Sequence, residues 1–298
     1  MNSQDSRVRG GGSGGQRTIA DSLAAASLQI TSALGLEQRE ARLEARVLAA
    51  FAWNVAQSWL IAHDTDTLDN DQTTNFQTLL HRRLGGEPIA YITGWREFYG
   101  REFHVTPDVL IPRPETELLV ERALARIPPD QAVGVLELGT GSGCIAITLA
   151  LERPNAHITA SDRSETALAV ARFNAGLLNA RVEFLASDWF AALGRRKFGL
   201  IVSNPPYVAA FDPHLGRGDV RFEPPAALAS GRDGLDDIRR IIHCARSHLH
   251  PAGGLLLEHA YNQGDATRLM LDAAGFTSLH TWRDLAEIDR VSGGVAPE

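Results

Sequence analysis

Residues 200–207, LIVSNPPY, join an apolar run that is typical of a buried strand to an amide, two prolines and an aromatic ring. Because Pro205 and Pro206 have carbonyls but no backbone N–H, the end of this strand carries a surplus of hydrogen-bond acceptors. Asn204 and the Pro205 carbonyl are suited to accept the two hydrogens of a planar NH2 group, and Tyr207 is suited to cover its face. The segment therefore predicts chemistry at an amide or amino nitrogen. A turn that only ends a strand is the structural alternative.

A glycine-rich loop follows another apolar run, in the sequence ELGTGSG at residues 137–143. Glycines at alternate positions let the backbone bend tightly and approach a ligand without a Cβ clash. The spacing excludes the nicotinamide fingerprint GxGxxG, whose last glycine would fall on Cys144, and no Gly-Lys-Ser/Thr follows to make a Walker loop. The loop is therefore a weak indication of a nucleotide-like ligand when taken alone. Its candidate binding residues are Gly139, Thr140, Gly141, Ser142 and Gly143.

Acidic residues end the next two predicted strands. The sequence spacing between the glycine loop and Asp162 is the one expected for an acid that accepts hydrogen bonds from both hydroxyls of a ribose, as in dinucleotide-binding folds. Asp188 and Trp189 end the following strand, where a carboxylate and an indole can hold an adenine amino group and stack on its ring. The alternative for both acids is that they cap the helices that follow them.

The composition is that of an ordinary globular protein, with 44% hydrophobic and 22% charged residues among 298. A formal net charge of −7 argues against a protein that binds nucleic acid mainly through a broad basic surface. Cys144 and Cys244 lie in no CxxC or Cys/His cluster, which predicts a reducing compartment and no structural metal. No segment has the pattern of a signal peptide or a membrane span. We therefore expect a cytoplasmic protein.

The pattern along the chain predicts several regions. They are a flexible Gly/Ser-rich tail at 1–16, a helical domain at 17–87, a β-hairpin linker at 88–112 with its turn at 99–101, and an α/β domain at 113–298. In the helical domain, Leu43, Val47, Leu48 and Phe51 lie on one face of an expected amphipathic helix.

In the α/β domain, strand and helix patterns alternate. The expected strands are 133–138, 157–162, 181–188, 198–204 and 254–259, and the expected helices lie near 142–152, 164–178, 235–249 and 262–274. Alternating units of this size imply a parallel, doubly wound sheet. Ligands on such sheets bind at the carboxyl ends of the strands, which is where the candidate side chains fall.

In this order, ELGTGSG, ASD, SDW and SNPPY resemble a class I S-adenosylmethionine-dependent methyltransferase. Two longer runs, residues 97–124 and 222–235, are similar to the HemK/PrmC family, which methylates the glutamine side chain of the Gly-Gly-Gln motif in peptide chain release factors. The resemblance covers approximately residues 85–292. One departure is His259-Ala260, where the family usually has an apolar residue followed by glycine.

The resemblance implies a Rossmann-like, mostly parallel seven-stranded sheet, with a small N-terminal helical domain for substrate recognition joined by a β-hairpin linker. It implies S-adenosylmethionine as the cofactor, S-adenosylhomocysteine as its product, and class 1 release factors as the protein substrate. The family's cofactor contacts then fall on the glycine loop and on Asp162, Trp189 and Asn204, and its substrate motif on Asn204, Pro205, Pro206 and Tyr207. Of these, Asn204, Pro205 and Tyr207 would carry the chemistry.

Two alternative functions are open at this point. An adenine-N6 methyltransferase acting on DNA or RNA shares the NPPY motif, but the acidic charge and the lack of a basic target-recognition segment disfavour direct nucleic-acid readout. A non-catalytic cofactor-binding or scaffold protein is disfavoured by the intact motif. A reductase is excluded by the glycine spacing.

Overall fold

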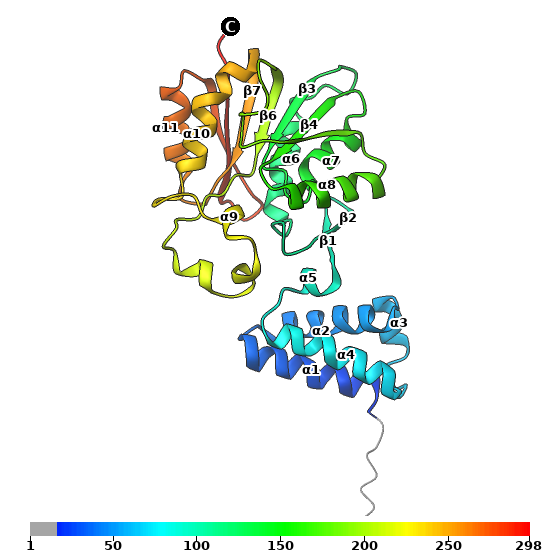
Figure 1. Ribbon diagram of the computed structural model, residues 1–298. Coiled ribbons are helices and arrows are strands. Elements are labelled where there is room, and N and C mark those ends of the chain that lie inside the picture. The colour runs from blue at the N-terminus through cyan, green and yellow to red at the C-terminus, as the bar shows by residue number, and fades with distance from the viewer. Residues whose placement is uncertain (1–16) are drawn as a thin grey trace, which may run out of the picture. The chain divides into compact units, whose positions relative to one another are not determined.

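The computed structural model describes residues 17–298 (Figure 1). The tail expected at residues 1–16 lies outside the described residues. Two compact units make up the chain, one ending at Thr93 and the other beginning at Gly94. The division that the sequence predicts after Glu87 lies close to this boundary, and the hairpin belongs to the second unit.

The first unit is helical. It comprises α1 (Ile19–Leu34), α2 (Gln38–Trp53), α3 (Gln57–Ala62), α4 (Asn70–Leu84) and α5 (Ile89–Thr93). Both α1 and α4 begin with a capping box. In this motif, two residues three positions apart each use their side chain to accept a hydrogen bond from the backbone N–H of the other. Thr18 pairs with Asp21 in this way, and Asp69 pairs with Gln72. These hydrogen bonds satisfy backbone N–H groups that the first turns of α1 and α4 would otherwise leave free.

The buried face of α2 differs from the apolar face that the sequence suggests. Leu43 is 57% exposed and Phe51 is 45% exposed, so these two residues of the expected face lie toward solvent, while Leu48 is buried as expected. The buried residues are Ala41, Ala45, Leu48 and Ala49. Small side chains at helical spacing let α1 and α4 approach the axis of α2 closely, and this packing decides which face is covered.

A short β-hairpin begins the second unit. It consists of β1 (Trp95–Phe98) and β2 (Arg101–His104), which pair antiparallel around a turn at Tyr99 and Gly100. The β-hairpin linker expected at residues 88–112 is wrong at its start, because Ile89–Thr93 forms helix α5. The Pro88 carbonyl accepts hydrogen bonds from the backbone N–H groups of Tyr91 and Ile92, which favours a helical turn there.

The second unit is built on a seven-stranded sheet, in the order β5-β4-β3-β6-β7-β9-β8. The strands are β3 (Gly134–Leu138), β4 (His157–Asp162), β5 (Val182–Ala186), β6 (Phe198–Ser203), β7 (Leu249–Glu258), β8 (Thr277–Arg283) and β9 (Asp289–Val295). Neighbours from β5 to β7 are parallel, and β9 runs antiparallel to both β7 and β8. The chain therefore winds outward in two directions from β3 and β6, and the switch point between them is where such sheets bind ligands.

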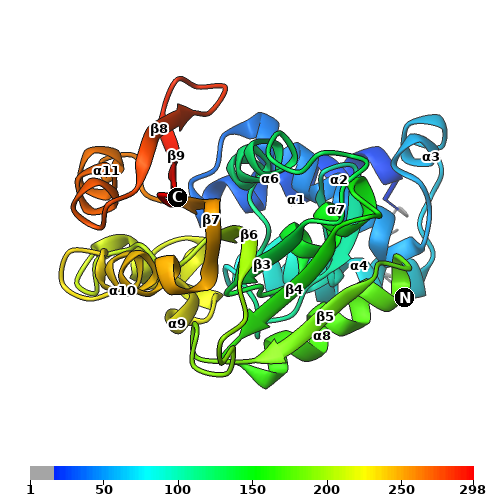
Figure 2. The same ribbon diagram turned by 90° about the horizontal axis from the view of Figure 1, so that it is seen from above.

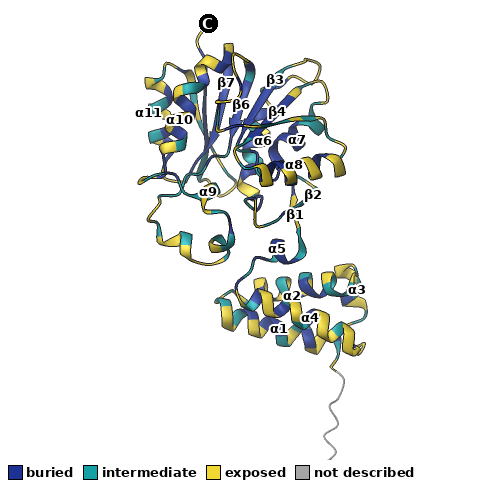
Figure 3. Cartoon of the chain, in the orientation of Figure 1, coloured by how far each residue is buried: buried dark blue, intermediate teal, exposed yellow. Residues whose placement is uncertain are grey.

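Helices cover both faces of this sheet (Figures 1 and 2). They are α6 (Glu117–Leu124), α7 (Cys144–Glu152) and α8 (Glu165–Leu177) on one face, and α10 (Asp236–Ala245) and α11 (Gly264–Ala273) on the other, with the short α9 (Pro225–Leu228) in the loop after β6. Successive residues of β6 alternate between the faces: Leu200 and Val202 pack in the core with α6 and α7, and Ile201 packs with α10 and α11. The central strands β3, β4 and β6 are accordingly buried on both sides, whereas the edge strands β5 and β8 are not (Figure 3).

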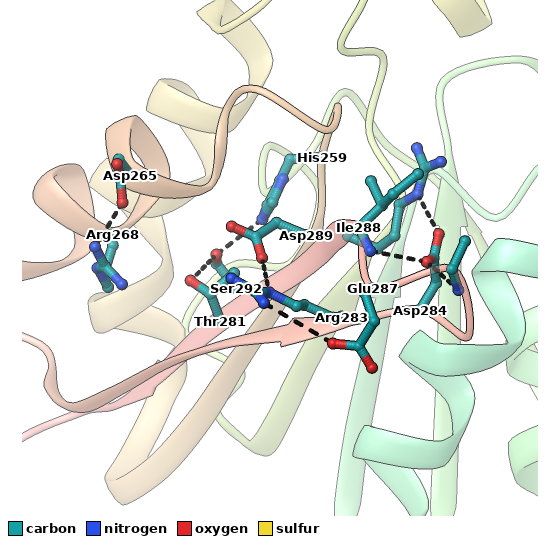
Figure 4. A network of polar contacts seen from close by, with 12 residues as sticks. His259, Asp265, Arg268, Thr281, Arg283, Asp284, Glu287, Ile288, Asp289 and Ser292 are labelled. Atoms are coloured by element: carbon teal, nitrogen blue, oxygen red, sulfur yellow. Dashed lines mark hydrogen bonds and ion pairs between the residues drawn. The ribbon is translucent and has the colours of Figure 1, made fainter.

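The sequence analysis gave no residue range for β8 or β9, which pair as an antiparallel hairpin near the C-terminus. His259, at the departure from the family pattern, is fully buried beside it. Its Nε2 lies 2.8 Å from the Ser292 hydroxyl, which in turn lies 2.8 Å from the Thr281 hydroxyl (Figure 4). Burial lowers the pKa of His259. The imidazole is therefore satisfied inside the fold, where it links the end of β7 to β9 and β8.

Candidate active site

A cavity of about 190 Å3 opens where β3, β4, β5 and β6 end. Most of the sequence-predicted cofactor residues line it: Gly139, Thr140, Gly141, Ser142, Asp162, Asp188, Trp189 and Asn204. Gly143 lies outside this lining. A Cβ at Gly143 would come within 2.9 Å of Ile147, so this glycine lets the loop pack on α7, and its part in cofactor binding stays a prediction.

The glycine loop is anchored to β4 through its backbone. The N–H groups of Gly139 and Thr140 donate to the Ser161 carbonyl at 2.8 and 2.9 Å. Gly141 has a φ of +54°, and no atom lies within 4 Å of the position that its Cβ would occupy. The backbone at Gly141 therefore faces open space in the cavity and allows a ligand to approach it closely.

Asp162 is held in place by two backbone amides. Its Oδ2 accepts from Gly141 N at 2.9 Å, and its Oδ1 accepts from Ser164 N at 2.9 Å. The N-cap of α8 is Ser164, whose hydroxyl accepts from Ala167 N, so Asp162 is not needed as the cap. Each carboxylate oxygen can accept a second hydrogen bond, which leaves acceptor capacity for a ligand.

Asp188 and Trp189 make contacts that the sequence did not predict. Both Asp188 oxygens are bound by Arg240 of α10, at 2.9 and 2.7 Å. The Trp189 indole donates to Asp237 at 3.2 Å, and its ring lies 3.5 Å from the position that a Cβ on Gly139 would take. The indole thus forms a flat wall against the glycine loop. The roles of both residues toward adenine stay predictions.

Glu137 also lines the first cavity, although the sequence analysis gave it no role. It is fully buried at the end of β3, and its Oε2 accepts from the Thr140 hydroxyl at 2.6 Å and from Ala146 N at 3.0 Å. Its Oε1 is buried and has no hydrogen-bond partner. Burial raises the pKa of Glu137 to about 8. A charged residue inside an apolar strand was the available signal, since such a group is rarely buried without a partner.

A second cavity, of about 340 Å3, lies against the NPPY segment. Asn204, Pro205 and Tyr207 line it, and Pro206 lines the first cavity instead. Asn204 lines both cavities. A group bound in one cavity can therefore meet a group bound in the other beside the Asn204 amide.

The NPPY segment is fixed by hydrogen bonds on both sides. The Asn204 Nδ2 donates to the Thr116 hydroxyl at 3.1 Å, which leaves its Oδ1 as a free acceptor. The Tyr207 hydroxyl donates to Glu258 at 3.3 Å, and the Tyr207 carbonyl accepts from Gln263 at 3.0 Å. Burial raises the pKa of Tyr207 well above its usual value, so the phenol stays protonated as a donor.

An ion pair joins the two longer sequence runs at this place. Arg113, from the first run, lines both cavities and pairs with Glu223 from the second. Glu223 is buried and also accepts from Ile111 N at 3.2 Å. Burial raises the pKa of Glu223, and the Arg113 guanidinium opposes that shift. Residues that are far apart in the sequence therefore meet at the cavities because the loop after β6 folds back.

Comparisons with known proteins agree with this geometry. Family models described as "Methyltransferase small domain" and "PrmC N-terminal domain" match residues 114–216 and 16–94. The release factor glutamine methyltransferase of Bordetella pertussis is 50% identical over 254 residues, which are 85% of this chain and 94% of that protein. The chain belongs to the release factor glutamine methyltransferase family.

Solved structures of methyltransferases share the fold of this family member. A methyltransferase from Pyrococcus furiosus superposes with a TM-score of 0.52 at 18% identity, over 74% of this chain and all of that one. The T. thermophilus 16S rRNA N2 G1207 methyltransferase, in complex with AdoMet and guanosine, gives 0.50 at 21% identity, over 68% of this chain and 49% of that one. The predicted class I methyltransferase fold with an N-terminal helical region is confirmed.

Two structural features are absent from residues 17–298 of this methyltransferase. Within that range, no helix is both long and apolar enough to cross a membrane. In the same described residues, no group of three or more His, Cys, Asp or Glu side chains is arranged to hold a metal ion.

We expect Asp162→Ala to weaken S-adenosylmethionine binding by roughly 2–4 kcal/mol, because the variant loses an oriented charged acceptor for the ribose hydroxyls. Isothermal calorimetry on the full chain measures the change. Ser164→Ala is a matched control, since it removes the cap of α8 and leaves Asp162 in place. Unchanged affinity in Asp162→Ala would show that this carboxylate only orders the loop.

Proposed function

We propose that this protein transfers a methyl group from S-adenosylmethionine to the side-chain amide nitrogen of the glutamine in the Gly-Gly-Gln motif of class 1 peptide chain release factors. The observation that carries the proposal is the position of Asn204, with a free Oδ1, between two cavities. One cavity suits the cofactor, and the other suits a side chain with an NH2 group. The names of the relatives support the choice of substrate.

The residues of the first cavity fit the cofactor's chemistry. The unpartnered Glu137 Oε1 suits the ammonium of the methionine moiety, and Asp162 has acceptor capacity for the ribose. The Trp189 ring, with Asp188 beside it, suits the adenine. The open backbone at Gly141 suits the close approach of the rest of the cofactor.

When bound, the cofactor supplies a methyl group on a positively charged sulfur, which is a strong electrophile. An amide nitrogen is a poor nucleophile because its lone pair is delocalised into the carbonyl, so alignment is the main task of the protein. Asn204 Oδ1 and the Pro205 carbonyl accept the two hydrogens of the substrate NH2 and thereby aim its nitrogen. Such positioning can supply on the order of 7–11 kcal/mol of the barrier. As positive charge develops on the nitrogen, the same hydrogen bonds strengthen, which favours the transition state over the ground state.

Incubation with methyl-labelled cofactor and purified release factor tests the proposal. We expect one labelled methyl group, which peptide mass mapping places on the glutamine of the Gly-Gly-Gln motif. A release factor with that glutamine replaced by alanine is the control and should take up no label. Label on another residue, or on a nucleic acid under the same conditions, would contradict the proposal.

The adenine-N6 alternative now has less support, because the family of this chain is named for a protein glutamine and the net charge is −7. A protein that acts on release factors works where translation takes place, so the proposal includes a cytoplasmic location.

A further inference from the structure

A buried amide at the start of α11 has no role in the steps above. Gln263 is 6% exposed and lines neither of the two cavities. It stands at the N-cap position of α11, yet its side chain makes no hydrogen bond that caps this helix. A buried amide is costly unless its donors and acceptor are used. The Gln263 side chain is therefore kept inside the fold by contacts other than a helix cap.

These contacts join three segments of the chain at the Gln263 amide. Its Oε1 accepts from Ala260 N at 3.0 Å, within the loop between β7 and α11. Its Nε2 donates to the Tyr207 carbonyl of the NPPY segment at 3.0 Å. The same nitrogen lies 3.4 and 3.3 Å from the carbonyls of Asp233 and Gly234, in the loop before α10. An amide side chain fits this place because it carries an acceptor at one corner and two donor hydrogens at the other.

Gly234 is a second feature of the chain that depends on the Tyr207 carbonyl. Its φ is +78°, and a Cβ there would lie 2.3 Å from the Tyr207 carbonyl oxygen and 2.8 Å from Gln263 Nε2. Any other residue would therefore displace either the carbonyl or the amide that binds it. The close approach of the three segments to this carbonyl requires a glycine at position 234.

Holding the Tyr207 carbonyl restricts the main chain of the NPPY segment. Pro205, two residues earlier, carries the carbonyl that accepts the second hydrogen of the substrate NH2 group. Since each proline ring locks its φ at about −65°, few backbone rotations separate the Pro205 carbonyl from the Tyr207 carbonyl. On the other side of Pro205, the Ser203 hydroxyl at the end of β6 donates to the Leu138 carbonyl at 2.7 Å. The Pro205 carbonyl is therefore held between one anchor on the sheet and another at Gln263.

We propose that Gln263 is a positioning residue for methyl transfer, which holds the main chain of the NPPY segment so that the Pro205 carbonyl faces the substrate nitrogen. This inference rests on the proposed function, and it adds to it the residue that sets the position of one of the two acceptors. A misplacement of about 1 Å in a reacting group can lower a rate by about a hundredfold, so a small shift of this segment has a large effect on kcat. A contact that only stabilised the fold would change the stability of the protein and leave kcat of the folded enzyme as it is.

The first test compares Gln263→Glu with the wild type in the full chain, at saturating cofactor. Glutamate keeps the shape and the acceptor for Ala260 N–H, but its ionised carboxylate has no hydrogen to donate to the Tyr207 carbonyl. At about pH 8, kcat on release factor should fall about tenfold or more, while KM for the cofactor stays within about threefold. Gln131→Glu makes the same change at an exposed residue before β3 and should keep the wild-type kcat. A wild-type kcat in Gln263→Glu at this pH would overturn the inference.

The same variant should recover activity as the pH is lowered. A carboxyl that faces carbonyl oxygens has a raised pKa, because its charged form is disfavoured there. Toward about pH 6 the introduced carboxyl takes up a proton, which it can donate to the Tyr207 carbonyl, so the ratio of variant kcat to wild-type kcat should rise. Taking the ratio removes the effect of the titratable side chains that both proteins share near this amide: Tyr207, Asp233, Glu258, His259 and Asp289. A ratio that stays constant with pH would overturn the inference.

Gln263→Met is the second variant, with a side chain of similar length that can neither donate to the Tyr207 carbonyl nor titrate. Its kcat should be about tenfold or more below that of the wild type, by the same factor at every pH. Thermal unfolding shows that the variant is folded at the assay temperature. A wild-type kcat in Gln263→Met would overturn the inference even if Gln263→Glu does not fold.

The proposed function and the positioning role fail differently. If the wild type transfers no methyl group to the Gly-Gly-Gln glutamine, both are wrong. If the wild type does so, but the Gln263 variants keep its kcat, only the positioning role is wrong.

Discussion

Asn204→Ala should lower the rate of methyl transfer at least about a hundredfold while S-adenosylmethionine affinity stays within about tenfold. The large effect is expected because the Asn204 carbonyl orients the nucleophile, and its hydrogen bond strengthens as charge develops in the transition state. The small effect on binding is expected because the rest of the first cavity is unchanged by the substitution.

Single-turnover kinetics at saturating cofactor measure the rate, and calorimetry measures the affinity. Asn155→Ala is the control: it removes an exposed amide that donates to the Pro129 carbonyl, at the other end of β4 from the site. Near-normal turnover in Asn204→Ala would contradict the orienting role of Asn204, on which the proposed function depends.

Loss of the helical unit should abolish most activity on intact release factor without weakening cofactor binding. The cofactor cavity is lined entirely by residues of the second unit, from Asp108 onward. A single glutamine side chain offers little contact area, and other exposed glutamines must not be methylated. Selectivity therefore requires additional contact area on the substrate protein, which we propose that residues 17–87 supply.

A chain that begins near Glu87 tests this role. Calorimetry should give the full-length affinity for S-adenosylmethionine, which also shows that the remaining unit is folded. Transfer to a short peptide containing Gly-Gly-Gln should be similar for both chains, whereas transfer to release factor should fall about a hundredfold or more in the shorter one. Full-length rates on release factor would show that the helical unit has another purpose.

The local sequence was sufficient to predict the candidate residues that lie at the ends of strands. The apolar runs before Gly139, Asp162 and Asn204 have the length and composition of buried parallel strands, and parallel strands bring their carboxyl ends to one edge. The structure places these residues around the first cavity for that reason. The turn of the β1–β2 hairpin is also a local feature, so its residue types were informative.

Long-range packing decided the rest. Which face of α2 is buried depends on how closely α1 and α4 approach its alanines, and the hydrophobicity of Leu43 and Phe51 does not contain that information. Strand β9 forms because β7 offers it an antiparallel edge, although its own sequence contains two adjacent glycines, which are weak strand formers.

The polar partners of the motif were likewise decided by the tertiary structure. Thr116 and Glu258 lie 88 and 51 residues from the motif side chains that they contact, Asn204 and Tyr207, and each looks ordinary in its own segment. A hydrogen bond at that separation depends on the register of β7 beside β6 and on the path of the chain before α6. The sequence alone therefore determined which residues lie at the strand ends beside the first cavity, because backbone periodicity is local. Only the fold determined how those groups are oriented and charged, because orientation and pKa depend on neighbours that the chain brings together from a distance.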